Sequence, residues 1–255
     1  MATFLFDDIV FGPVKSRRLG SSLGINLLPR DAKVCTFNCV YCECGWTTKT
    51  YNGLPATSEV MQSMDDEFLR LHKNNIPVDV VTFAGNGEPT IHPDFDKIID
   101  HTMALRDKYF AHAQIAVLTN ATLLHKQRVN HALQKVDMPL LKLDSAVEST
   151  VKLLNQPQRK FDFQQYLSNI RNFKGKRYIQ TMFVRYNREG LHVDNTTDEE
   201  LTEWLQELDR IKPHLVMIYS IARDTPDSGV QAVQKEKLMK IAQLVEARGY
   251  KTQVS

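Results

Sequence analysis

The sequence has no hydrophobic run approaching the length of a membrane span. A transmembrane helix needs roughly 20 consecutive apolar residues, and every apolar run in this 255-residue chain is shorter. The opening, MATFLFDDIVFGP, also lacks the basic start and long apolar core of a signal peptide. These absences predict a cytoplasmic protein with no membrane partner.

Cysteine is scarce and confined to one place. All four cysteines lie in the segment VCTFNCVYCECGW, as Cys35, Cys39, Cys42 and Cys44. A secreted disulfide framework would spread its cysteines along the chain to join distant segments. The clustering therefore argues against disulfides and indicates a metal site.

Long charged runs, repeats and low-complexity segments are also missing. The net charge is only +2, and 42% hydrophobic with 24% charged residues is typical of a globular protein. The one compact basic group is Lys15, Arg17 and Arg18. Because this length suits a single α/β barrel, we expect an irregular N-terminal arm over residues 1–20 and one core domain over residues 21–255.

Short apolar runs alternate with longer amphipathic stretches, which predicts an α/β fold. The runs expected to form strands are 22–28, 78–85, 114–120, 136–146, 177–184, 214–222 and a short one at the end of the chain. The expected helices are 58–74, 93–109, 124–134, 162–173, 198–211 and 234–248. Such alternation predicts a partial (βα)6 TIM-like barrel with parallel strands, whose chemistry lies at the carboxyl ends of the strands.

The cysteine segment follows the first strand of this barrel and has the spacing C-x-x-x-C-x-x-C. Three thiolates, from Cys35, Cys39 and Cys42, suit iron and leave one iron of a [4Fe-4S] cluster without a protein ligand. Tyr41 adds a flat ring beside that open iron, and Cys44 is expected to be a packed or free thiol.

Two other interpretations of the cysteines remain open. All four could bind a structural zinc ion, although zinc modules usually pair ligands from two separate hairpins. The cysteines could also be reduced and free of metal. Either case fits a non-catalytic zinc or iron–sulfur regulatory protein, which would contact nucleic acid through Lys15, Arg17 and Arg18.

Polar residues also follow the next strands. The turn FAGNGEPTIHP places Gly85, Gly87 and Glu88 after the second expected strand, where small residues allow close backbone approach and a carboxylate can accept bonds from an ammonium group. The alternative is an ordinary βα turn. Asn120 ends the third strand.

The fourth expected strand carries two charged residues on one face. Lys142 and Asp144 occupy alternate positions, and a buried lysine needs an anion. The two residues face either a bound ligand or each other, as an ion pair.

The cysteine spacing, with an aromatic residue before the last cysteine, resembles the signature of the radical S-adenosylmethionine (SAM) superfamily. The preceding string FGPVKSRRLGSSLGIN is similar to that of its wyosine-synthetase-like subgroup. The resemblance implies an enzyme, an oxidoreductase or a transferase, that cleaves SAM reductively to a 5′-deoxyadenosyl radical, which abstracts hydrogen from a substrate.

The resemblance also assigns residues and partners. It implies that Glu88 binds the SAM amino group, helped by Gly85, Gly87 and Asn120, while Lys142 and Asp144 contact the SAM carboxylate and ribose. It implies an electron donor such as flavodoxin or ferredoxin. Because few elements remain to close over a small molecule, we expect a macromolecular substrate, either RNA or protein.

Overall fold

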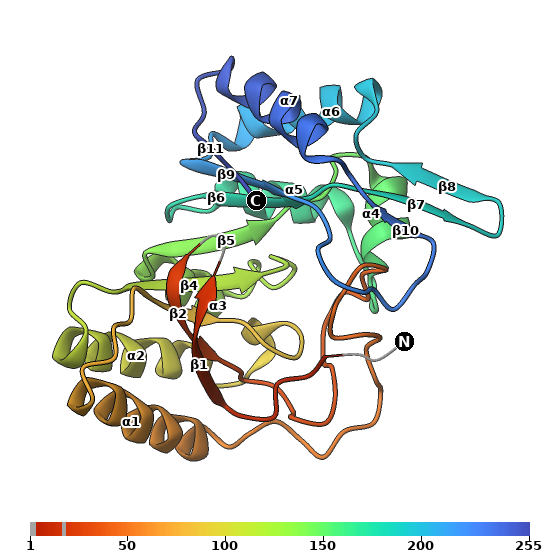
Figure 1. The fold of residues 1–255 in the computed structure, drawn as a ribbon. Coiled ribbons are helices and arrows are strands. Elements are labelled where there is room, and N and C mark those ends of the chain that lie inside the picture. Colours follow the sequence, from red (N-terminus) through yellow and green to blue (C-terminus); the bar gives the residue numbers. More distant parts are fainter. Residues whose placement is uncertain (1–3, 17–18) are drawn as a thin grey trace.

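The structure is a computed structural model that describes residues 4–16 and 19–255. Its centre is a curled eight-stranded sheet in the order β1-β2-β3-β4-β5-β6-β9-β11 (Figure 1). The strands are β1 (Val10–Ser16), β2 (Gly20–Ile25), β3 (Val80–Phe83), β4 (Gln114–Thr119), β5 (Met138–Lys142), β6 (Tyr178–Met182), β9 (Leu215–Tyr219) and β11 (Thr252–Val254). All neighbouring strands from β2 to β11 are parallel, whereas β1 is antiparallel to β2.

Helices follow each parallel strand except the last, so the predicted partial (βα)6 barrel is confirmed. They are α1 (Thr57–Lys73), α2 (Phe95–Tyr109), α3 (Gln127–Lys135), α4 (Glu148–Asn155), α5 (Phe163–Asn172), α6 (Asp198–Ile211) and α7 (Lys235–Glu246), with a short 3-10 helix, η1 (Pro89–Ile91). Within the described ranges, no helix is both long enough and apolar enough to cross a bilayer.

The concave face of the sheet changes character along its strands. Near the amino ends it carries a small apolar cluster of Val80, Ala116, Met138, Leu140 and Met217. Because side chains alternate along a strand, the same face then continues from Leu140 to Lys142 and from Met217 to Tyr219. The barrel interior is thus apolar at its base and polar at the carboxyl ends of the strands.

One helix and four strands were not expected. The arm is not irregular throughout, because Val10–Ser16 forms β1 along the edge of the sheet. Helix α4 precedes α5 in one crossover, and a second sheet, in the order β10-β7-β8, is built from β7 (Val184–Arg188), β8 (Leu191–Asp194) and β10 (Val230–Ala232). Arg17 and Arg18 of the predicted basic group lie outside the described residues, and Lys15 is exposed.

A backbone contact holds the cysteine segment against the turn that follows β3. Val34 and Gly87 form an isolated parallel bridge, in which Val34 N donates to Asn86 O at 2.9 Å and Glu88 N donates to Val34 O at 3.1 Å. Gly87 has a φ of +137°, and a Cβ there would lie 1.9 Å from Val34 O. Only glycine permits this approach.

We expect Gly87→Ala to lower the free energy of unfolding by about 2 to 5 kcal/mol, because it combines an unfavourable φ with a backbone clash. Gly249→Ala is the matched control: Gly249 also has a positive φ, of +85°, but no neighbour within 4 Å of its added Cβ. The control should lose only about 1 to 2 kcal/mol. Urea unfolding measures both, and equal losses would contradict the proposed role of the bridge.

Candidate functional site

A cavity of about 200 Å³ opens at the carboxyl ends of the strands. Its walls are Lys33, Cys35, Phe37, Cys39, Tyr41, Cys42, Gly85, Gly87, Glu88, Leu118, Thr119, Asn120, Lys142, Gln180 and Tyr219. The fold therefore brings together every predicted site residue except Asp144, which lies behind the cavity wall.

Two of the three predicted cluster ligands contact neighbouring side-chain amides. Asn120 Nδ2 lies 3.4 Å from Cys35 Sγ, and Asn155 Nδ2 lies 3.4 Å from Cys39 Sγ. Within the described part of the chain, no three histidine, cysteine or acidic side chains converge as ligands of a single metal ion.

Cys44 contacts both the glycine turn and Cys42. Its Sγ lies 3.4 Å from the backbone oxygen of Gly85, and its single thiol proton can be donated either there or to the Cys42 sulfur. The contact joins the end of the cysteine segment to the glycine turn, and it accords with the prediction that Cys44 is a packed thiol.

Lys33 is a site residue that sequence reasoning missed. Its side chain is buried, with 3% exposure for the residue, and Nζ donates to Gly45 O at 2.7 Å. Burial opposes its charge, but the nearby sulfur atoms of Cys42, Cys39 and Cys35 outweigh burial and raise the pKa of Lys33. No carboxylate pairs with it among residues 4–16 and 19–255, so its charge is compensated only by sulfur. Its position two residues before Cys35 was the only signal.

The cysteines differ in acidity. Burial raises the pKa of Cys35 to about 12 and also raises the pKa of Cys39. A hydrogen bond from the Cys44 thiol, together with the nearby Lys33 ammonium, lowers the pKa of Cys42. Before any metal binds, Cys42 is therefore the thiolate of the set.

Glu88 is a buried carboxylate on the opposite wall. It is 2% exposed, and Oε1 accepts bonds from the Thr90 and Thr119 hydroxyls at 2.5 and 2.7 Å, while Oε2 accepts from Asn120 N at 2.6 Å. Burial, which outweighs these bonds, raises the pKa of Glu88. No cation pairs with Glu88 in the described structure, so a cationic group in the cavity would complete its environment.

Lys142 and Asp144 form the ion pair that was one of the two sequence interpretations. Lys142 Nζ lies 3.6 Å from Asp144 Oδ2. Asp144 also accepts bonds from the Tyr41 hydroxyl and from Asn155 Nδ2, the latter at 2.6 Å. Lys142 still lines the cavity, whereas the Asp144 oxygens are occupied by protein donors. The ribose contact of Asp144 remains a prediction.

Comparison with known proteins gives the family. Residues 31–205 match the radical SAM superfamily. The chain belongs to that superfamily. The radical SAM superfamily consists of enzymes, and the resemblance drawn from the cysteine spacing is confirmed.

The radical SAM chain also has close relatives in sequence. It is 31% identical over 245 residues to a Brachyspira hyodysenteriae protein named GTPase Obg, a match that covers 93% of this chain and 33% of that protein. It is 31% identical over 217 residues to the UPF0026 protein MJ1312 of Methanocaldococcus jannaschii, covering 81% and 62% of the two chains. The chain thus spans a third of one relative and under two thirds of the other.

Solved structures share the radical SAM fold. A radical SAM methyltransferase from Sphaerobacter thermophilus superposes with a TM-score of 0.66 at 14% identity, covering 92% of this chain and 65% of that one. Streptococcus suis SuiB, bound to its precursor peptide SuiA, gives 0.64 at 16% identity, covering 91% and 48%. The wyosine synthetase TYW1, with a lysine-pyruvate adduct bound, gives 0.59 at 14%, covering 89% and 73%.

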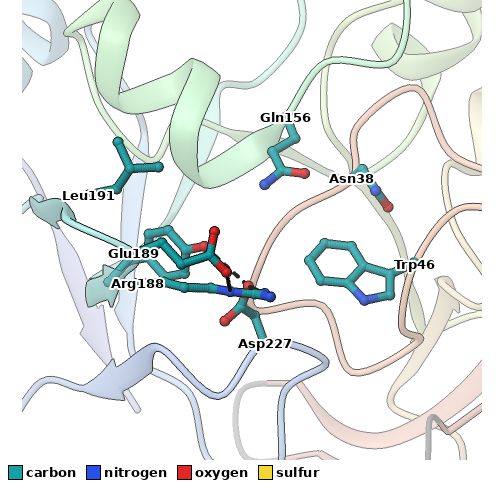
Figure 2. Close-up of a pocket in the computed structure, with 8 residues that line it drawn as sticks. Asn38, Trp46, Gln156, Arg188, Glu189, Leu191 and Asp227 are labelled. Carbon is teal, nitrogen blue, oxygen red and sulfur yellow. Dashed lines mark hydrogen bonds and ion pairs between the residues drawn. The ribbon is translucent and has the colours of Figure 1, made fainter.

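A second cavity, of about 370 Å³, lies beside the radical SAM cysteine segment. It is bounded by Trp46 after the cysteines, by Gln156 after α4, and by the β7–β8 hairpin. Figure 2 shows Arg188 of that hairpin extending toward the Trp46 ring. The charge of Arg188 is already paired with Asp227 at 2.7 Å and with Glu189 at 3.2 Å, so this cavity has no free cation to attract an anion.

The acidity of the radical SAM cysteines can be tested by alkylation. In cluster-free protein at pH 7, iodoacetamide should label Cys42 at least about tenfold faster than Cys35, because only the thiolate reacts and both side chains are half-buried. Lys33→Met should slow labelling of Cys42 by raising its pKa, whereas Lys33→Arg should not. Peptide mass spectrometry gives the rates, and equal rates at the two cysteines would refute the assignment.

Proposed function

We propose that this chain binds a [4Fe-4S] cluster through Cys35, Cys39 and Cys42, and SAM at the open iron. When bound, the two groups supply reductive cleavage of SAM to a 5′-deoxyadenosyl radical that abstracts hydrogen from a substrate. The observation that carries the proposal is a pair of buried groups in one cavity, neither of which has an ion-pair partner among the described residues. Lys33 is a cation among cysteine sulfurs, which suits an anionic cluster, and Glu88 is a carboxylate among neutral donors, which suits the SAM ammonium.

The remaining residues would orient SAM. Gly85 and Gly87 keep the turn free of side chains, and Asn120 N fixes the Glu88 carboxylate. Lys142 is the candidate for the SAM carboxylate, with its ammonium held by Asp144. Asp144 would reach the SAM ribose only by giving up one of its protein donors, so its main role in this arrangement is to position Lys142.

The partners follow from this chemistry. The cluster needs a one-electron donor, for which flavodoxin or ferredoxin is suitable. A macromolecular substrate remains our proposal, since the similar SuiB structure holds a peptide. Within this proposal the substrate is either protein or RNA, and the whole protein's activity is inferred from the part that the family covers.

Anaerobic reconstitution tests the cluster. Wild-type protein and Cys44→Ala should each bind four irons and form 5′-deoxyadenosine when reduced with dithionite and SAM. Cys35→Ala, Cys39→Ala and Cys42→Ala should lose both the cluster absorbance and the nucleoside product. Iron analysis with chromatography of the product measures this. If Cys44→Ala loses the cluster as fully as Cys42→Ala, the three-ligand assignment fails, and a colourless protein that binds zinc supports the regulatory alternative.

Glu88→Gln should weaken SAM binding about ten- to a hundredfold in reconstituted protein, because a charge-assisted bond contributes roughly 1.5 to 3 kcal/mol. Thr90→Val is the matched control, since it removes one bond to Glu88 Oε1 and keeps the carboxylate. Calorimetric titration measures both, after thermal unfolding shows that each variant is folded. Unchanged SAM affinity in Glu88→Gln would remove this residue from the site.

A further inference from the structure

A separate cavity of about 400 Å³ lies on the rim of the barrel, outside the SAM site. It is formed by the loop between β4 and α3 and by the loop between α4 and α5. Its lining residues are Thr36, Thr122, Leu123, His125, Lys126, Pro157, Arg159, Lys160, Phe161, Asp162, Gln165, Tyr166 and Asn169. None of them lines the cavity that contains the cysteines.

The rim of this cavity is cationic. Lys126, Arg159 and Lys160 are exposed and have no ion-pair partner within the described ranges. The one carboxylate in the lining, Asp162, already accepts a bond from Gln165 N at 2.9 Å as the N-cap of α5. Neighbouring cations that lack carboxylate partners favour the binding of a negatively charged ligand.

The floor of the cavity is apolar and aromatic. Phe161 is half-buried, with its ring centroid 5.4 Å from that of Tyr166 and 5.6 Å from that of Phe37. Leu123 and Pro157 complete the floor. A flat aromatic ring fits over such a floor, and side-chain rings that face solvent commonly stack on nucleobases.

From these features we propose that this cavity binds a nucleotide, with its base on the Phe161 floor and its phosphate among Lys126, Arg159 and Lys160. The ligand is either a free nucleotide or one unit of an RNA strand, since both present the same chemistry. An acidic peptide would use the cations but would leave the aromatic floor uncovered.

The cavity is adjacent to the cysteine segment. Thr36 lies between Cys35 and Phe37, and its hydroxyl is bonded to the Thr122 hydroxyl at 2.7 Å and to Asn120 Nδ2 at 2.8 Å. Phe37 lines the SAM cavity while its ring contacts Phe161. An RNA strand anchored by one nucleotide here would therefore run past the mouth of the reactive cavity.

Fluorescence anisotropy of the full chain, without added SAM or cluster, tests the site using labelled AMP and a labelled single-stranded RNA of about ten nucleotides. Lys160→Glu and Arg159→Glu should each weaken binding at least about tenfold, whereas Lys160→Arg should retain it. Lys240→Glu, an equal charge change on exposed α7, is the control and should have little effect. Phe161→Leu should weaken binding about five- to a hundredfold, because the base would lose the aromatic ring on which it stacks.

The two labelled probes distinguish a free nucleotide from an RNA strand as the ligand. Binding of both probes indicates a free-nucleotide site, and binding of the RNA alone indicates a strand site. Unchanged affinity in both charge-reversal variants, or a labelled polyglutamate peptide that binds more tightly than the RNA, would overturn the proposal. The measurement needs no cluster, so its result does not depend on the function proposed for the cysteines.

Discussion

The site depends on one backbone contact, the bridge between Val34 and Gly87. It sets the segment that carries Lys33 and Cys35 directly against the turn that carries Glu88. The contact requires a residue without a Cβ, because the added atom would overlap the Val34 carbonyl oxygen. Residues more than fifty positions apart in the sequence thereby line one cavity.

Buried charge is the second constraint that shapes the site. The low-polarity interior makes an isolated ammonium or carboxylate unfavourable unless an opposite charge lies nearby. Among the described residues, Lys142 has such a partner in Asp144, whereas Lys33 lies among the cysteine sulfurs and the Gly45 carbonyl, and Glu88 accepts only from neutral donors. The protein is thus arranged for an anionic group beside Lys33 and a cationic group beside Glu88, as the cluster and the SAM ammonium would supply.

The two cavities near the cysteine segment differ in charge. The cavity at Trp46 and Arg188 has its charges already paired (Figure 2). The cavity at Phe161 is reached from it through Gln156 and Pro157, and carries cations that have no ion-pair partner among the described residues. The second cavity is therefore the one suited to a negatively charged ligand.

By itself, the sequence determined the barrel, the order of its parallel strands, and the cysteine and glycine–glutamate segments, because these depend on local periodicity and short spacings. It did not reveal β1, the short helix α4 or the small sheet, since short and edge elements lack a long periodic apolar pattern. Only the tertiary structure showed that Lys33 is buried and that Asp144 is turned away from the cavity. Burial and charge pairing are decided by residues that are distant in sequence and adjacent only after folding, so no local pattern specifies them.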